Sequence, residues 1–322
     1  MSPASRRASR SLLPVIVVLS VVLAGLLAVI VRRETRSTGT ATVAAARPLP
    51  APEPTARPST AQVRRATAEL DRRSPGRDTS AWSVRGARAR ATSVPILMWH
   101  VVATPKPGTP YPDLWVTPEQ FAAQVDALRG AGFTAVTTED LWKAWHGTGT
   151  LPRHPVVLSF DDGDLSHVTN AAPVLARAGW PGVLNLAVNH LGPKGLPMWG
   201  ARRLVREGWE IDSHTVDHLD LTTLDDAALA EQLTRSRMLI ERRLGVSTRF
   251  LCYPAGRNDD RVRAAARQAG YVAATTVVPG IAAPTDDPFQ LPRIRVGPTT
   301  TPESLVDQAR GTAAPPTVVG PA

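Results

Sequence analysis

The stretch VVLSFDDGD, residues 156–164, joins an apolar run to two consecutive acidic residues and a glycine. The run of Val, Val, Leu, Ser and Phe predicts a buried strand. Two like charges at its end, Asp161 and Asp162, repel each other unless a cation lies nearby. We therefore expect this strand to end at a functional site, and the partners of the two carboxylates must come from elsewhere in the chain.

Apolar strands alternate with amphipathic helices on both sides of this stretch, from Val94 onward. The segments expected to form strands are VPILMWH, FTAVTT, VVLSF, GVLNLAV, WEIDSH, RFLCYP, VAATTVV and LPRIRV. Such alternation predicts an α/β fold with a parallel sheet and crossover helices, and about seven repeats predict closure into a (β/α) barrel. In that architecture the active site lies where the strands end.

Charge is distributed unevenly along the chain. Residues 1–92 hold 16 arginines, no lysine and 5 acidic residues, a net charge of +11, whereas residues 93–322 carry a net charge of −2. A nucleic-acid-binding domain is expected to carry its positive charge on the folded body, so we predict no nucleic-acid partner. An anionic membrane surface or a cell-wall polymer fits the basic N-terminal part better.

The N-terminal part also contains an apolar stretch at residues 12–31, which is long enough to cross a bilayer core as a helix. We predict a cytoplasmic N-terminus and transmembrane anchor over residues 1–33, with secretion after signal cleavage as the alternative. Arginines flank both sides of the stretch, so the positive-inside rule leaves the orientation of the folded domain open. Residues 34–92, rich in Pro, Ala and Arg, predict a disordered linker, residues 93–310 the folded domain and residues 311–322 a flexible tail.

Histidines and carboxylates follow several predicted strands. His214 and His218 have the spacing H-x-x-x-H, which can present two imidazoles to one ion, although this spacing alone is a weak signal. A carboxylate from a neighbouring strand would complete a His-His-Asp site with positions open for water and substrate. Because adjacent carboxylates point in different directions, one of Asp161 and Asp162 can bind the ion while the other acts as a base. An isolated DDG is more typical of a turn or a helix cap.

Three motifs in order give the chain a resemblance to a known family. They are SFDDG at residues 159–163, SHTVDH at 213–218 and YPAG at 253–256. With these motifs the chain resembles the polysaccharide deacetylases, carbohydrate esterase family four, over about residues 94–296. The segments VPILMWHVV, GWEIDSHTVDHLDL and LPRIRV are similar to the branch that includes deacetylases of poly-β-1,6-N-acetylglucosamine.

The resemblance implies a distorted (β/α) barrel of about seven strands and a divalent metal ion, often zinc, with cobalt, nickel or manganese as alternatives. It implies Asp162, His214 and His218 as metal ligands and Asp161 as the general base. It further implies that a backbone N–H of the third motif, at Ala255, stabilises the oxyanion.

The chain departs from the family pattern at two places. Cys252 stands where many members have an arginine, and either Arg293 or Arg249 could replace it. No histidine follows His218, so the C-terminal acid of many members is missing. In the branch that this chain resembles, the acid corresponds to the histidine closing the first strand, here His100, whose alternative role is that of a core histidine.

Other side chains have less specific interpretations. Trp99 is expected either at the mouth of the site or in the core, and Trp199 either stacks on a sugar ring or packs against protein. Surface or core roles are expected for the histidines that lack a partner at ligand spacing, which are His146, His154, His167 and His190. Cys252 is the only cysteine, which excludes an intramolecular disulfide.

These features together predict a metal-dependent N-deacetylase that hydrolyses the amide of N-acetylglucosamine units in an extracellular or cell-wall polysaccharide. Its expected partners are the polysaccharide and, through the N-terminal helix, a membrane. Peptidoglycan or an O-acetyl ester is the alternative substrate. The alternative from a different class is an inactive glycan-binding module, against which the intact set of candidate ligands argues.

Overall fold

The computed structural model describes residues 79–315 with the exception of Ala81. Strand β5 (Pro155–Asp162) is buried along seven of its eight residues and ends, as predicted, in the two acidic residues. It lies parallel to β1 (Ile96–Trp99) on one side and to β6 (Val183–Leu186) on the other. Because residues on both faces of this strand are buried, its sequence is a continuous apolar run rather than an alternating one.

The strands close into a barrel. Strand β1 pairs with both β5 and β10, which joins the two ends of the sheet into a ring of parallel strands. Besides β1, β5 and β6, the ring contains β7 (Glu210–Ser213), β8 (Phe250–Cys252), β9 (Ala273–Pro279) and β10 (Leu291–Arg295). Strand β4 (Thr134–Ala135) pairs with β5 alone, outside the ring. The predicted α/β barrel of about seven strands is therefore confirmed.

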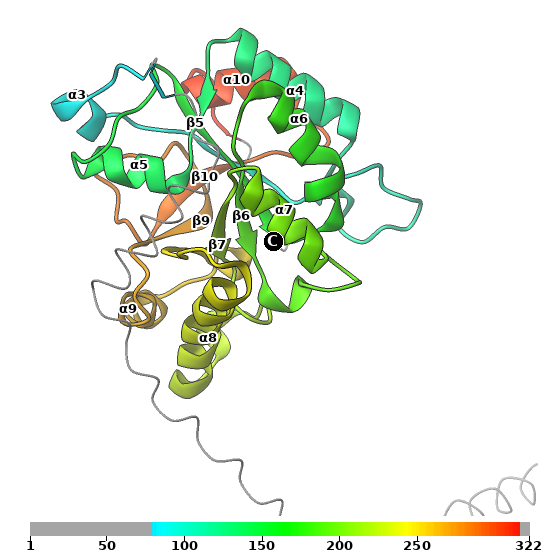
Figure 1. The fold of residues 1–322 in the computed structure, drawn as a ribbon, viewed down its shortest axis with the longest axis vertical. Coiled ribbons are helices and arrows are strands. Elements are labelled where there is room, and N and C mark those ends of the chain that lie inside the picture. The colour runs from blue at the N-terminus through cyan, green and yellow to red at the C-terminus, as the bar shows by residue number, and fades with distance from the viewer. Residues whose placement is uncertain (1–78, 81, 316–322) are drawn as a thin grey trace, which may run out of the picture. The chain divides into compact units, whose positions relative to one another are not determined.

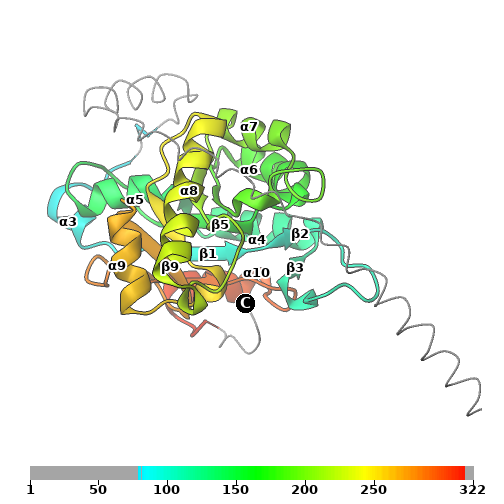
Figure 2. The ribbon, with the colours of Figure 1, turned by 90° about the horizontal axis from the view of Figure 1, so that it is seen from below.

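Helices surround the barrel in both views (Figures 1 and 2). They are α3 (Gly86–Arg90), α4 (Pro118–Gly130), α5 (Thr138–Trp145), α6 (Ala172–Ala178), α7 (Met198–Arg206), α8 (Asp226–Leu244), α9 (Asp260–Gln268) and α10 (Pro302–Arg310). Local chemistry fixes their ends: Thr117 and Thr137 form capping boxes at the starts of α4 and α5, and left-handed Gly245 ends α8.

Short elements connect the strands to these helices. The 3-10 turns are η1 (Pro112–Leu114), η3 (Val188–His190), η4 (Leu221–Thr223) and η5 (Pro254–Gly256), and η2 (His167–Ala171) is a π-helix. A separate parallel pair, β2 (Val101–Val102) with β3 (Trp115–Val116), begins directly after His100. This pair frames a proline-rich loop, residues 103–114, beside the barrel.

Trp99 belongs to the core. It is fully buried, stacks on Phe160 at 5.6 Å between ring centroids and meets Phe121 edge-on at 5.5 Å. Its indole N–H donates to Gln124 over 3.1 Å, so the one polar atom of the ring is satisfied. Of the two roles expected for Trp99, packing is therefore the correct one.

The folded part begins earlier than residue 93. Trp82 and Val84 are buried, Val84 forms an antiparallel bridge with Leu151, and α3 follows. The predicted linker boundary is thus wrong by about ten residues, because two isolated apolar residues without periodicity gave no sequence signal. At the other end α10 stops at Arg310, before left-handed Gly311.

The predicted anchor at residues 12–31, the linker up to residue 78 and the last residues of the tail lie outside the described residues. Within the described part of the chain, we find no helix that combines the length and the apolar character needed to cross a membrane.

Candidate active site

One pocket brings together the six residues that were expected from the sequence to bind metal or take part in catalysis. Its volume is about 270 Å³. The side chains and backbone that line it come from the carboxyl ends of several barrel strands and from adjoining loops: His100, Tyr111, Leu114, Asp161, Asp162, His214, His218, Tyr253, Ala255 and Val277. Because the strands are parallel, their carboxyl ends meet at one rim, and this explains how residues far apart in sequence converge.

The predicted metal ligands lie close together. Oδ1 of Asp162 is 3.6 Å from Nε2 of His214 and 3.3 Å from Nε2 of His218. Asp162, Thr215 and His218 all have left-handed backbones, with φ of 76°, 70° and 57°. Such strained residues cluster at functional sites, where the surrounding structure holds them in place. Two imidazole nitrogens and one carboxylate oxygen form a donor set suited to a divalent transition-metal ion.

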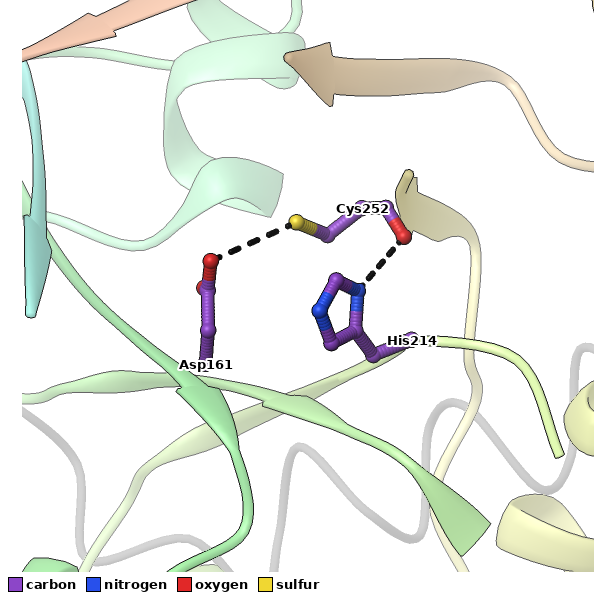
Figure 3. Close-up of side chains that lie close together, drawn as sticks. All are labelled: Asp161, His214 and Cys252. Atoms are coloured by element: carbon purple, nitrogen blue, oxygen red, sulfur yellow. Dashed lines mark hydrogen bonds between the residues drawn. The ribbon is translucent and has the colours of Figure 1, made fainter. Parts of the chain in front are cut away.

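A second contact fixes the tautomer of His214. Its Nδ1 lies 2.7 Å from the carbonyl oxygen of Cys252, shown as a dashed line in Figure 3. A carbonyl can only accept, so Nδ1 carries a hydrogen, which leaves Nε2, on the side of Asp162, as the ring nitrogen available to a metal ion. Burial, reinforced by nearby His214, lowers the pKa of His218 and favours the neutral imidazole that binds metal. The residues therefore fit a divalent ion.

A competing group of potential ligands overlaps this one. Donor atoms of Asp161, His214 and Cys252 also lie within 4.8 Å of one another. However, burial raises the pKa of the Cys252 thiol well above its usual range, and its sulfur lies 3.1 Å from the guanidinium of Arg293. A protonated thiol beside a fixed cation disfavours a second cation. The thiol instead points toward Asp161 over 3.7 Å (Figure 3).

Asp161 is held as a carboxylate. Arg293 donates to both of its oxygens over 2.8 Å, and Asn185 donates to Oδ1 over 2.7 Å. Burial alone would raise the pKa of Asp161, but the charge and hydrogen bonds of Arg293 hold it well below the usual range. Arg293 thus supplies the arginine that many family members have at the position of Cys252. Arg249 does not, because it pairs with Glu139 on α5.

His100 lies beside this carboxylate. Its Nε2 is 3.9 Å from Oδ2 of Asp161, and its side chain is buried. Burial lowers the pKa of His100, although the charges of Asp161 and Asp162 oppose that shift. Within the described residues its Nδ1 has no hydrogen-bond partner. A buried imidazole with a lowered pKa thus lines the pocket next to an ionised carboxylate.

Ala255 lines the same pocket from η5, just after β8. Its backbone is left-handed, with φ of 54° and ψ of 14°. A residue with a Cβ adopts this conformation at a cost of about 1 kcal/mol, and such strain is typical of active sites. The third motif therefore brings a strained backbone, rather than a reactive side chain, to the site.

Sequence analysis missed some features of the site. It did not single out Asn185, although a polar residue inside the apolar run GVLNLAV was a usable signal. A second cavity, of about 660 Å³, shares Asp162 with the pocket. Its lining comes from strand ends and the loop after β6: Val101, Asp162, Gly163, Asp164, Asn189, His190, Leu191, Gly192, Pro193, Lys194 and Gly195. Trp199, although exposed, lines neither cavity.

The remaining histidines have varied surroundings. His146 stacks on Trp142 and His154 lies beside Phe133, in line with the packing or surface roles predicted for them. His167 is fully buried. His190 is exposed, and its ring lies 6.3 Å from that of His218.

The barrel and its rim of Asp and His residues define a polysaccharide deacetylase domain, and residues 148–274 match the sequence model of the family described as polysaccharide deacetylase. The match identifies a polysaccharide deacetylase domain in this part of the chain, and members of the family are hydrolases of carbon–nitrogen bonds other than peptide bonds. The matched range contains Asp161, Asp162, His214 and His218, whereas His100 and Arg293 lie outside it.

Individual relatives agree with this assignment. A Bacillus subtilis protein whose name places it among the polysaccharide deacetylases is 28% identical over 222 residues, covering 69% of this chain and 76% of the relative. The poly-β-1,6-N-acetyl-D-glucosamine N-deacetylase of Staphylococcus epidermidis is 27% identical over 197 residues, which cover 56% of this chain and 68% of that enzyme. The structure of a Bacillus cereus polysaccharide deacetylase superposes with a TM-score of 0.62 at 26% identity, covering 68% of this chain and 69% of that one.

Proposed function

We propose that this protein is a metal-dependent N-deacetylase that removes acetyl groups from N-acetylglucosamine units of an extracellular polysaccharide, with a β-1,6-linked polymer as the first candidate. One observation carries the proposal. The donor atoms of Asp162, His214 and His218 share a pocket with an ionised carboxylate, Asp161, and a buried imidazole, His100. This arrangement supplies a metal site, a proton acceptor and a proton donor around one small cavity.

Asp162, His214 and His218 would hold the ion, for which we propose zinc. When bound there, a divalent ion supplies Lewis acidity, which polarises a carbonyl oxygen and makes a water molecule more acidic. Asp161 accepts the proton of the attacking water, since Arg293 keeps it ionised over the whole physiological pH range. The backbone N–H of Ala255 donates to the oxyanion that develops on the acetyl carbonyl.

His100 gives a proton to the leaving amine. An amine departs from a tetrahedral intermediate as a neutral group only after its nitrogen is protonated, so an acid is required. Burial lowers the pKa of His100, whereas the charges of Asp161 and Asp162 counteract this shift and favour the imidazolium that can donate the proton. The distance of 3.9 Å between Nε2 of His100 and Oδ2 of Asp161 supports a reaction in which both groups act on the same bound acetamide.

The shape of the site favours a polymer. The catalytic pocket shares Asp162 with the larger cavity, which leaves room for sugar units next to the reacting one. Similarity to the Staphylococcus epidermidis enzyme, which is named for its β-1,6-linked substrate, supports this linkage as the first candidate.

We further propose that residues 12–31 anchor the enzyme in the cell membrane with the barrel outside, where such a polymer is found. The length and apolar character of the stretch support this part of the proposal. Accessibility of the barrel to protease added to intact cells would test it.

Acetate release tests the activity directly. The purified full chain would be incubated with β-1,6- and β-1,4-linked N-acetylglucosamine oligomers and with peptidoglycan, in the presence of zinc or cobalt. We expect metal-dependent release that is lost in Asp161→Asn, with the β-1,6 oligomer as the fastest substrate. Faster release from peptidoglycan would assign the alternative substrate, and no release from any N-acetylated glycan would overturn the proposed function.

A further inference from the structure

We infer that Ser166, His167 and Asn170 form a clamp that positions His100 by holding its main chain. We refer to these three residues as the His100 clamp. The inference rests on the proposed function in one respect, namely that His100 is the proton donor. It adds to that function three residues that lie outside the metal site and line neither cavity.

Three hydrogen bonds connect the clamp to residues 100–102. Nε2 of His167 bonds to the carbonyl oxygen of His100. The hydroxyl of Ser166 accepts from the amide of Val102 over 3.0 Å, and the amide group of Asn170 donates to the carbonyl oxygen of Val102 over 2.7 Å. The segment that carries His100 is therefore held at both ends by side chains from one short stretch of chain.

The origin of that stretch explains why the clamp matters for catalysis. Ser166 and the π-helix η2 follow Asp161 and Asp162 after only a few residues. Main-chain atoms of His100 and Val102 are thus tied to the segment that also carries the base and a metal ligand. Two features therefore determine the distance between His100 and Asp161: these hydrogen bonds and the pairing of β1 with β5.

His167 has no other polar function within the described residues. It is fully buried, its ring lies 5.5 Å from that of Phe160, and its Nδ1 has no hydrogen-bond partner there. Because a carbonyl can only accept, Nε2 carries the hydrogen. Burying an imidazole with one unsatisfied nitrogen costs free energy that an apolar ring would not cost. The hydrogen bond from its other nitrogen is what distinguishes His167 from an apolar residue at this position.

The backbone of η2 also fits a positioning role. Single-turn π-helices are rare and occur frequently at functional sites. Here Ser166, His167 and Asn170 all reach the segment of residues 100–102, whereas Thr169 in the same turn is exposed and bonds back to the carbonyl oxygen of Leu165. Thr169 therefore offers a matched control inside the same π-helix.

Two substitutions separate the hydrogen bond from the packing. His167→Phe keeps an aromatic ring in the buried site but removes the donor, and His167→Gln restores an N–H group near the position of Nε2. The full-length enzyme would be assayed on an N-acetylglucosamine oligomer and on 4-nitrophenyl acetate. The ester's leaving phenolate departs without protonation, so its hydrolysis does not need the acid.

For His167→Phe we expect kcat on the oligomer to fall about 10- to 100-fold with KM unchanged, and ester hydrolysis to stay within about twofold. His167→Gln should recover most of the loss, and Thr169→Ala should show none. His100→Ala should have the same selectivity as His167→Phe, with a larger loss. Equal loss on both substrates, or no recovery with Gln, would overturn the clamp and leave a purely structural role.

Hydrogen–deuterium exchange tests the clamp without catalysis. Amides of the peptide covering residues 96–104 should exchange faster in His167→Phe than in wild type or Thr169→Ala. Unchanged exchange would overturn the inference even if the enzyme is active. Conversely, if no N-acetylated glycan is hydrolysed but exchange rises as expected, the proposed function fails and the clamp stands as a positioning device for His100.

Discussion

Arg293 on β10 donates to both carboxylate oxygens of Asp161 on β5, each over 2.8 Å, and neither side chain is exposed. The two strands flank β1 on opposite sides, so this buried ion pair lies across the barrel interior next to β1, the strand directly before His100. A bidentate arginine fixes the orientation of the carboxylate as well as its charge. The pair therefore determines both where the base points and at which pH it is ionised.

Substitution Arg293→Met should abolish most of the activity and destabilise the fold. Removing one partner of a buried ion pair leaves an uncompensated charge, which costs about 3–5 kcal/mol of unfolding free energy. Without the guanidinium the pKa of Asp161 rises, so the residual activity should fall as the pH drops through that raised value. Acetate release across pH and urea-induced unfolding of both proteins measure these effects.

Arg249→Met is the matched control. Arg249 forms a partly exposed pair with Glu139, and such pairs contribute about 1 kcal/mol or less. We expect activity within about twofold of wild type and a small change in stability. If Arg249→Met lost as much activity as Arg293→Met, the assignment of Arg293 as the partner of the base would be wrong.

Metal content distinguishes the two overlapping groups of donors. If Asp162, His214 and His218 hold the ion, His218→Ala should lose metal and activity, whereas Cys252→Ser should keep its metal because its sulfur is not a ligand. Dialysis against a chelator should inactivate the wild type, and zinc should restore it. Elemental analysis of the purified proteins gives the result, and the opposite pattern would favour the group that includes Cys252.

Most of the candidate site residues that could be predicted from the sequence lie within short motifs. Asp161 with Asp162 and His214 with His218 form short motifs at strand ends, and parallel strands bring their ends to one rim whatever the details of packing. The alternation of strands and helices also predicted the barrel, because the apolar pattern of each element can be recognised within a short stretch of sequence.

The partners of these residues could not be predicted in the same way. Arg293 and Asp161 are 132 residues apart, and Arg249 fits the sequence equally well. Which of the two arginines pairs with Asp161 depends on which strand neighbours β1 and on which side chain points into the barrel. Both are properties of the closed barrel. The position of Trp99 could not be predicted for a similar reason, because a side chain at a strand end can face either the pocket or the core.

Two acids on β7, partly buried Glu210 and buried Asp212, should make stability depend on pH. Burial raises the pKa of Glu210 from 4.5 to about 7, with nearby Glu139 adding to the rise, and burial also raises the pKa of Asp212. The unfolded chain then releases its proton at lower pH than the folded one, so stability falls as the pH rises from about 4.5 to about 7. The slope is at most about 1.4 kcal/mol per pH unit for each proton.

Glu210→Gln removes one titrating group from this pair. Relative to wild type, the variant should gain stability progressively between pH 5 and pH 7, and urea unfolding at several pH values measures the difference. Glu231→Gln is the control, because Glu231 forms an exposed pair with Arg235 and should leave the pH profile unchanged. Parallel profiles for wild type and Glu210→Gln would contradict the raised pKa.

Tyr111 should bind the sugar chain at the mouth of the pocket. Its side chain is 57% exposed, although it lines the pocket, and its backbone is left-handed with φ of 50° between two prolines. An exposed ring held in a strained conformation is available for stacking on a pyranose, a contact of about 0.5–1.5 kcal/mol. Tyr111→Ala should therefore raise KM for oligomers about 3- to 10-fold, with kcat within about twofold.

Two further variants test whether an effect at Tyr111 comes from stacking of its ring on the sugar. Tyr111→Phe should keep the wild-type KM, because stacking depends on the ring and not on its hydroxyl. Trp199→Ala should also leave KM unchanged, since Trp199, although 56% exposed, lines neither of the two cavities. A raised KM in Trp199→Ala with no effect in Tyr111→Ala would place the sugar chain along α7, the helix that carries Trp199, instead of beside the loop of residues 103–114.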